Sequence, residues 1–137
     1  MIRIVVADDH VVVRSGLEQL VGTFDDVELV GTVANGAEAA DVCIATRPDV
    51  ALLDLEMPVV DGIEATRRIR EVSPDTNVVI FTSFSDRERI LRALDAGAIG
   101  YLLKDAEPEE LARAIRAAAR GEAPLDPRAG RALLRAR

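Results

Sequence analysis

The chain has 137 residues, 49% of them hydrophobic and 30% charged, which is enough for one compact domain with a core. Its net charge of −7 argues against a protein that grips nucleic acid through the phosphates over its whole surface, because such binding needs a basic surface. The single cysteine, Cys43, cannot form an internal disulfide, and no apolar run approaches a membrane span, so we expect a cytoplasmic protein.

Short β-branched runs alternate along the chain with longer stretches whose apolar residues recur at helical spacing. The runs predict strands over residues 4–7, 27–33, 50–53, 78–81 and 99–103. The stretches between and after them predict helices over residues 11–23, 36–47, 62–72, 86–96 and 108–120, the fourth capped by Ser85 or Asp86. This alternation predicts an α/β fold with parallel strands and helices on both faces. Only the second run alternates in polarity, so we expect it at an edge.

Polar side chains follow four of the five predicted strands, where an open parallel sheet forms its functional crevice. They are Asp8 and Asp9 after the first strand, Asp54 after the third, Thr82 and Ser83 after the fourth, and Lys104 after the fifth. Three carboxylates meeting there would repel one another unless a cation neutralised them, and their oxygens suit Mg²⁺. The sequence therefore predicts a magnesium site in which Asp54 accepts a phosphoryl group, with Lys104 and Thr82 stabilising the added charge.

Taken singly, most of these residues also have a purely structural interpretation. Asp8 or Asp9 could cap the first helix, and Thr82 could be a loop hydroxyl. Lys104 could be a solvated charge. Asp54 is harder to explain in this way, because an acid that closes a buried strand needs a partner. The joint occurrence of these residues at four strand ends carries the prediction.

The charge is unevenly distributed along the chain. Residues 1–110 hold 10 basic and 22 acidic side chains, a net charge of −12, whereas residues 111–137 hold 7 basic and 2 acidic side chains, a net charge of +5. In the basic part, Arg113, Arg116 and Arg120 recur at helical spacing. This stripe is most simply a solvated helix face, and a dimer face is the alternative.

As a set, these motifs resemble the receiver domain of bacterial response regulators in two-component systems. The resemblance covers about residues 1–120 and rests on Asp8-Asp9-His10, on Asp54 with Met57-Pro58 and Asp61-Gly62, on Thr82-Ser83, and on the run Gly-Tyr-Leu-Leu-Lys-Asp at residues 100–105. Within that family, the Asp-Asp-His start and residues 13–17, 100–105 and 121–134 look like the NarL/FixJ (LuxR-type) group. The resemblance implies a flavodoxin-like three-layer sandwich with a five-stranded parallel sheet in the order 2-1-3-4-5 and five helices.

The resemblance also implies a role for each residue of the site. Asp54 would be the phosphoacceptor, and Asp8, Asp9, Asp54 and the backbone carbonyl of Glu56 would bind Mg²⁺. Thr82, Ser83 and Lys104 would contact the phosphoryl group, and Tyr101 would turn inward as the switch partner of Thr82. Glu56 and Phe84 would tune dephosphorylation.

The same resemblance implies partners and a domain plan. Residues 1–120 would form the receiver domain, and residues 121–137 a linker tail with a short helix over residues 126–135, leading to a DNA-binding helix-turn-helix domain outside this chain. A sensor histidine kinase would supply the phosphoryl group, and DNA would be contacted only through the output domain. The dimer face that is the alternative for the arginine stripe would form on phosphorylation, through the first and fifth helices or through the fourth helix, fifth strand and fifth helix. A stand-alone receiver is the alternative to part of a transcription factor.

We expect a switch that catalyses only its own phosphorylation and dephosphorylation, not an enzyme with a separate substrate. A haloacid-dehalogenase-type phosphohydrolase also forms an aspartyl phosphate, but its Asp-x-Asp motif ends the first strand, whereas Asp54 follows the third. A pure interaction module that keeps the pocket as a relic is a further alternative.

Many receivers have proline after the pocket lysine, with a cis peptide. Here Asp105 follows Lys104, and we expect that bond to be cis too, although this costs about 3 kcal/mol without proline.

Overall fold

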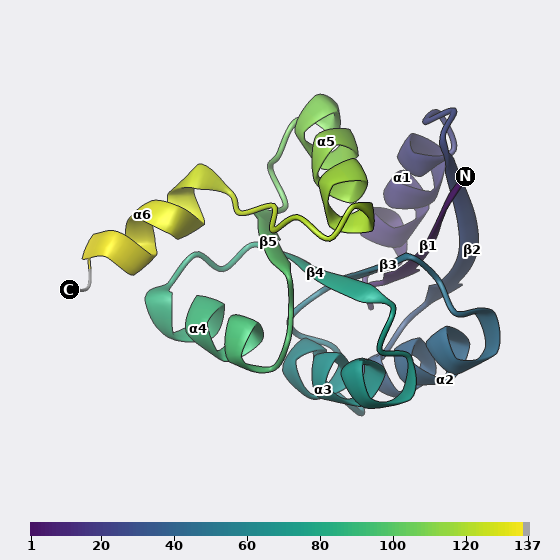
Figure 1. Ribbon diagram of the computed structural model, residues 1–137, viewed down its shortest axis with the longest axis horizontal. Helices are drawn as coiled ribbons and strands as arrows, with labels where there is room; N and C mark the ends of the chain where they lie inside the picture. Colours follow the sequence, from purple (N-terminus) through teal and green to yellow (C-terminus); the bar gives the residue numbers. More distant parts are fainter. Residues whose placement is uncertain (136–137) are drawn as a thin grey trace.

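The computed structural model of the protein describes residues 1–135. Its sheet consists of five parallel strands in the order β2-β1-β3-β4-β5 (Figure 1). The strands are β1 (Ile2–Ala7), β2 (Val27–Val33), β3 (Val50–Leu53), β4 (Asn77–Thr82) and β5 (Gly100–Leu103). The predicted fold class, the strand order and the edge position of the second strand are therefore confirmed.

Helices cover both faces of the sheet (Figure 1). They are α1 (Val11–Val21), α2 (Gly36–Thr46), α3 (Gly62–Val72), α4 (Arg87–Asp95), α5 (Pro108–Ala119) and α6 (Pro127–Arg135). The first five match the predicted helices to within one or two residues at each end, and α6 is the short helix expected in the tail. Asp61 and Asp86 cap α3 and α4 by accepting the backbone N–H of Glu64 and Arg89.

Two hydrophobic clusters fill the spaces above and below the sheet. In β3, Val50 and Leu52 face the cluster under α1 and α5, while Ala51 and Leu53 face the cluster under α2, α3 and α4. Successive side chains of a strand point to opposite faces, so a strand covered on both faces must be apolar at every position. Cys43 lies in the second of these clusters with no exposed surface, and burial raises the pKa of its thiol to about 12, so it is a core residue.

The carboxyl ends of two pairs of neighbouring strands are in register, and this alignment builds the site. Ala7 at the end of β1 pairs with Leu53 at the end of β3, and Thr82 at the end of β4 pairs with Leu103 at the end of β5. The residues that follow these positions therefore emerge at one edge of the sheet. None of the helices within residues 1–135 has the length and apolar character needed to cross a membrane.

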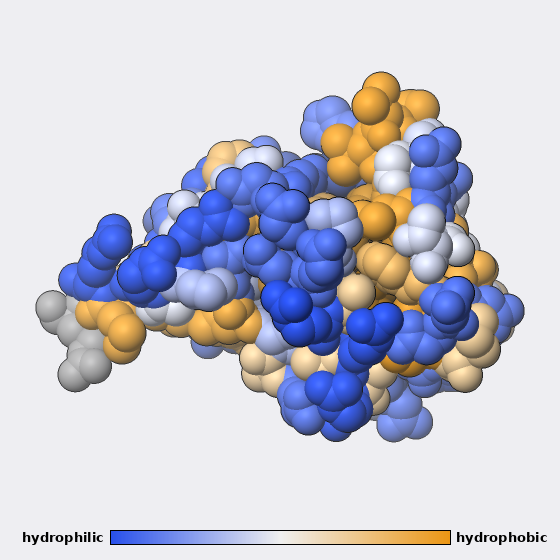
Figure 2. Space-filling view, turned by 90° about the horizontal axis from the view of Figure 1, so that it is seen from above, coloured by the Kyte–Doolittle hydropathy of each residue, from blue (hydrophilic) through white to orange (hydrophobic). Residues whose placement is uncertain are grey.

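The tail after α5 folds back against the domain. The backbone of Tyr101 in β5 accepts the N–H of Asp126 and donates to the carbonyl of Pro124, both at 2.9 Å, so that Leu125 forms a parallel bridge with Tyr101. Helix α6 then lies beside α4 at the far end of the molecule (Figure 1), with Ala129 fully buried. On the face seen from above, hydrophilic residues predominate toward this end (Figure 2).

Candidate functional site

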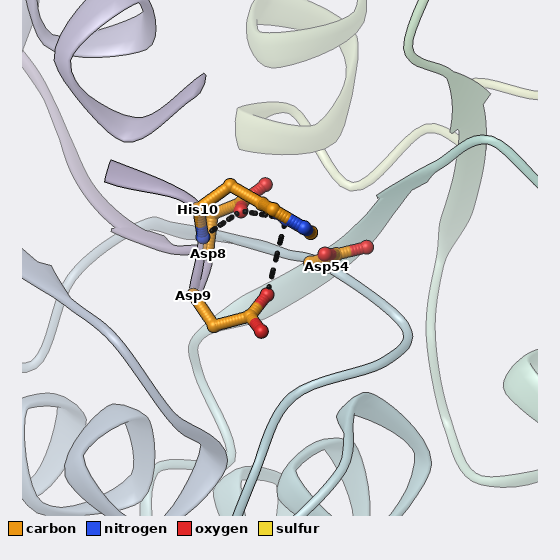
Figure 3. Close-up of side chains that lie close together, drawn as sticks. All are labelled: Asp8, Asp9, His10 and Asp54. Atoms are coloured by element: carbon orange, nitrogen blue, oxygen red, sulfur yellow. Dashed lines mark hydrogen bonds and ion pairs between the residues drawn. The ribbon is translucent and has the colours of Figure 1, made fainter. Parts of the chain in front are cut away.

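Three carboxylates converge at the carboxyl ends of β1 and β3. Asp8 and Asp9 follow β1, and Asp54 follows β3, where its backbone N–H donates to the carbonyl of Ala7 at 2.9 Å. Asp8 and Asp54 are only 1% and 6% exposed. The three carboxylates and His10 form one group, in which a possible ligand atom from each residue lies within 4.8 Å of those of the others (Figure 3).

Lys104 joins this group from the end of β5. Its Nζ lies 2.9 Å from Oδ2 of Asp8 and 3.1 Å from Oδ2 of Asp54. Burial by itself lowers the pKa of Lys104, but the two carboxylates outweigh burial and raise it above its ordinary value. The lysine is therefore a fixed positive charge inside the pocket.

Asp54 lies in a mixed environment. Burial raises the pKa of its carboxyl group, the nearby Lys104 ammonium lowers it, and the Asp8 carboxylate raises it, with a net increase. The N–H of Leu55 donates to Oδ1 at 2.8 Å, while Lys104 contacts Oδ2. These two contacts fix the orientation of a buried carboxylate at the edge of a cavity, which is a suitable arrangement for a nucleophile.

The pocket has the donor set and the charge to hold a divalent cation. Three carboxylates and one ammonium leave a net charge of −2 when all are ionised. Among the described residues, Oδ2 of Asp8 and Oδ1 of Asp9 are the buried side-chain atoms that make no hydrogen bond of good geometry. The first has only its ion pair with Lys104, and the second has only the His10 ring nitrogen 3.3 Å away. A hard cation such as Mg²⁺ would satisfy these oxygens and balance the charge, so the residues present fit the predicted metal.

A cavity of about 220 Å³ opens beside Asp54. Its lining residues are His10, Asp54, Glu56, Thr82, Ser83, Phe84 and Lys104. The structure thus brings the predicted phosphoryl-binding residues Thr82, Ser83 and Lys104 together with the predicted tuning residues Glu56 and Phe84. His10 lies at the mouth, 66% exposed, with Nδ1 3.3 Å from both Asp8 and Asp9.

Tyr101 does not line this cavity. Its ring is fully buried, and its hydroxyl donates to the backbone carbonyl of Phe84 at 2.7 Å. The N–H of Phe84 in turn donates to Oγ1 of Thr82 at 3.4 Å. The two predicted switch residues are therefore linked through the backbone of Phe84, with Tyr101 in the inward position.

Two sequence-based interpretations are wrong. The Lys104-Asp105 peptide is trans, as are all peptide bonds of the described chain, in line with the high cost of a cis bond without proline. These two residues instead form a turn in which the N–H of Ala106 donates to the carbonyl of Leu103. The capping alternative for Asp8 and Asp9 also fails, because the N-cap of α1 is His10, whose side chain makes no capping hydrogen bond. The Asp8 carboxylate accepts the backbone N–H of His10 itself, at 2.8 Å, and not an N–H of the first helical turn.

Sequence reasoning missed one residue that contacts the lining of the cavity. Arg89 of α4 stacks over the ring of Phe84, 4.1 Å from its centroid, and its guanidinium lies 3.6 Å from Glu56. It therefore touches both predicted tuning residues. An arginine near the start of an amphipathic helix gives no sequence signal for such contacts, because they depend on the position of α4 relative to the loop after β3.

The chain belongs to the family of response regulator receiver domains, and the match to this family covers residues 4–116. Among its relatives, an uncharacterised transcriptional regulatory protein YhcZ of Bacillus subtilis is 51% identical over 81% of this chain and 52% of its own length. The transcriptional regulatory protein LiaR of the same organism is 41% identical over 100% of this chain and 65% of its length. The chain thus spans between half and two thirds of these relatives.

Solved structures agree with this assignment. A two-component response regulator of the LuxR family from Aurantimonas superposes with a TM-score of 0.92 at 34% identity, covering 98% of this chain and 96% of that one. The receiver domain of the response regulator NarL from Mycobacterium tuberculosis superposes with a TM-score of 0.85 at 35% identity, covering 88% and 98%. The fold and the subfamily predicted from the sequence are therefore confirmed.

Proposed function

We propose that this domain is a phosphorylation-dependent signalling switch that takes a phosphoryl group from a histidine kinase onto Asp54. The observation that carries the proposal is Lys104, whose ammonium group bridges the buried carboxylates of Asp8 and Asp54 at the edge of the cavity. A cation held in this way can stay in contact with a phosphoryl group on Asp54 and compensate its charge.

In the proposed reaction, a carboxylate oxygen of Asp54 attacks the phosphorus of a phosphohistidine in line. The new O–P bond forms as the N–P bond breaks, and the leaving imidazole takes up a proton from solvent. Lys104 and the hydroxyl of Thr82 would bind the phosphoryl oxygens. Bound Mg²⁺, held by Asp8, Asp9, Asp54 and the Glu56 carbonyl, would supply charge neutralisation. The domain would thus catalyse its own phosphorylation and later hydrolysis, at a rate set by Glu56 and Phe84.

The partners follow from the same proposal. The protein would work in the cytoplasm, where its kinase would present the phosphohistidine to the acidic pocket. Relatives named as transcriptional regulators support an output through a DNA-binding domain after residues 121–137, which would serve as the linker. Dimerisation on phosphorylation would connect the two events.

Intact-mass analysis after incubation with acetyl phosphate and Mg²⁺ tests the proposal. We expect the wild-type chain to gain one phosphoryl group and Asp54→Asn to gain none, because an amide is not a nucleophile for this reaction. Asp41→Asn removes an exposed carboxylate of α2 and should behave as wild type. Phosphorylation of the Asp54→Asn variant to the same extent as wild type would refute the assignment.

A further inference from the structure

The tail of the domain contacts the residues on both sides of the pocket lysine. The carboxylate of Asp126 accepts the backbone N–H of Leu103 at 3.4 Å, and the guanidinium of Arg128 makes two hydrogen bonds to the carboxylate of Asp105, at 2.6 and 2.7 Å. Leu103 and Asp105 are the immediate neighbours of Lys104. The short turn that carries the lysine is therefore held from outside by residues more than twenty positions further along the chain.

The anchor of this contact is buried. Asp126 is 3% exposed, and its carboxylate accepts Nε and Nη2 of Arg128, both at 3.1 Å, as well as the backbone N–H of Arg128 at 2.9 Å. Arg128 thus bridges a buried and an exposed carboxylate with a planar group that suits paired contacts. An isolated exposed ion pair would contribute little, but here one of the two acids is fixed in the core.

The position of Asp126 is itself set by the sheet. The N–H of Asp126 donates to the carbonyl of Tyr101, and the N–H of Tyr101 donates to the carbonyl of Pro124. Backbone hydrogen bonds therefore tie the segment to β5. Gly100 allows this approach, because a Cβ at that position would lie 2.5 Å from the carbonyl oxygen of Pro124. A hollow of about 470 Å³ between the tail and the turn is lined by Ser83, Ser85, Leu103, Lys104, Asp105 and Arg128.

We propose that Arg128 is a positioning residue for the phosphoryl-acceptor site, acting through Asp105 on Lys104. The inference rests on the proposed function of Asp54. Lys104 can support phosphoryl transfer only while its ammonium group stays beside the Asp54 carboxylate. The conformation of the turn that carries Lys104 sets the position from which its side chain reaches that carboxylate. Because coupling between two sites acts in both directions, a change at Lys104 also changes how firmly the tail is docked.

The rate of Asp54 phosphorylation by acetyl phosphate with Mg²⁺ tests this role in the full chain. We expect Arg128→Ala to slow the reaction about three- to tenfold, the size of an ordinary coupling between residues in contact. Arg131→Ala removes an exposed arginine of the same helix and should react as wild type. Arg128→Lys keeps the positive charge but cannot make the paired guanidinium contacts, so its phosphorylation rate should fall between those of wild type and Arg128→Ala.

A second measurement separates positioning from general destabilisation. In a Lys104→Met background, Arg128→Ala should cause no further slowing, because the residue through which it acts is gone. Additional slowing in that background would overturn the proposal, as would an Arg128→Ala rate equal to that of Arg131→Ala. If the wild-type chain gains no phosphoryl group on Asp54, the proposed function itself fails. If it does and only the Arg128 effect is missing, the positioning role alone is refuted.

Discussion

Gly62 shows how closely the backbone is packed behind the acceptor residue. It begins α3, and its N–H donates to the carbonyl of Leu55 at 2.8 Å. A Cβ at this position would lie 2.3 Å from the backbone oxygen of Asp54. The glycine is therefore required by the close approach of α3 to the strand end that carries Asp54.

We expect Gly62→Ala to lower the free energy of unfolding by about 1–3 kcal/mol, as overpacking of a close contact does. The displaced Asp54 segment should also accept a phosphoryl group more slowly. Gly16→Ala in α1 is the matched control, because nothing lies within 4 Å of its Cβ position, and it should stabilise the helix by about 0.5–1 kcal/mol. Urea unfolding and the phosphorylation rate measure both effects, and equal stabilities for the two variants would contradict the close-contact argument.

Helix α6 shows how a short element is held by one buried face. Ala129 has no exposed surface and shares a hydrophobic cluster with Ile90 and Ala93 of α4 and with Tyr101 of β5. Ala132 and Leu133 pack partly against the same cluster. A nine-residue helix is marginal alone in water, so this contact with α4 provides most of its stability.

Ala129→Asp should undock α6, because it would place an unpaired carboxylate in an apolar contact. The amide of Tyr101, which donates to the carbonyl of Pro124, should then exchange its hydrogen faster with solvent. Gly130→Ala should act in the opposite direction, because its Cβ would make an ordinary contact with Leu125 at 3.7 Å and remove a glycine from a helix. Hydrogen exchange and thermal unfolding distinguish the two. Unchanged exchange at Tyr101 in Ala129→Asp would refute this account of docking.

At the scale of the whole molecule, an Mg²⁺ ion bound in the acidic pocket should make stability depend on the Mg²⁺ concentration. Binding only to the folded chain would raise the free energy of unfolding by about 2.7 kcal/mol at a concentration one hundred times the dissociation constant. Asp9→Asn should lose most of this gain, and without Mg²⁺ it should be at least as stable as wild type, since one repelling charge is gone. Asp41→Asn should keep the full response. Thermal unfolding with and without Mg²⁺ checks this, and equal responses of wild type and Asp9→Asn would exclude Asp9 as a ligand.

Most of the fold and the core of the site could be predicted from the sequence because both depend on local patterns. Strands buried on both faces leave continuous apolar runs, and a parallel sheet brings Asp8, Asp54 and Lys104 to one edge whatever the details of packing. The contacts of Arg89 and Arg128 could not be predicted in this way. They depend on how α4 and the tail are placed in three dimensions, and many surface arginines have the same local sequence context.

The parallel bridge between Tyr101 and Leu125 has a consequence for how the chain behaves before it is complete. An uncovered outer strand exposes unpaired backbone groups that can recruit strands from other molecules and lead to aggregation. On the β5 side, residues 124–126 occupy this position within the same chain. During synthesis β5 emerges before them, so a nascent chain would carry an open sheet edge there until the tail has left the ribosome and closed it.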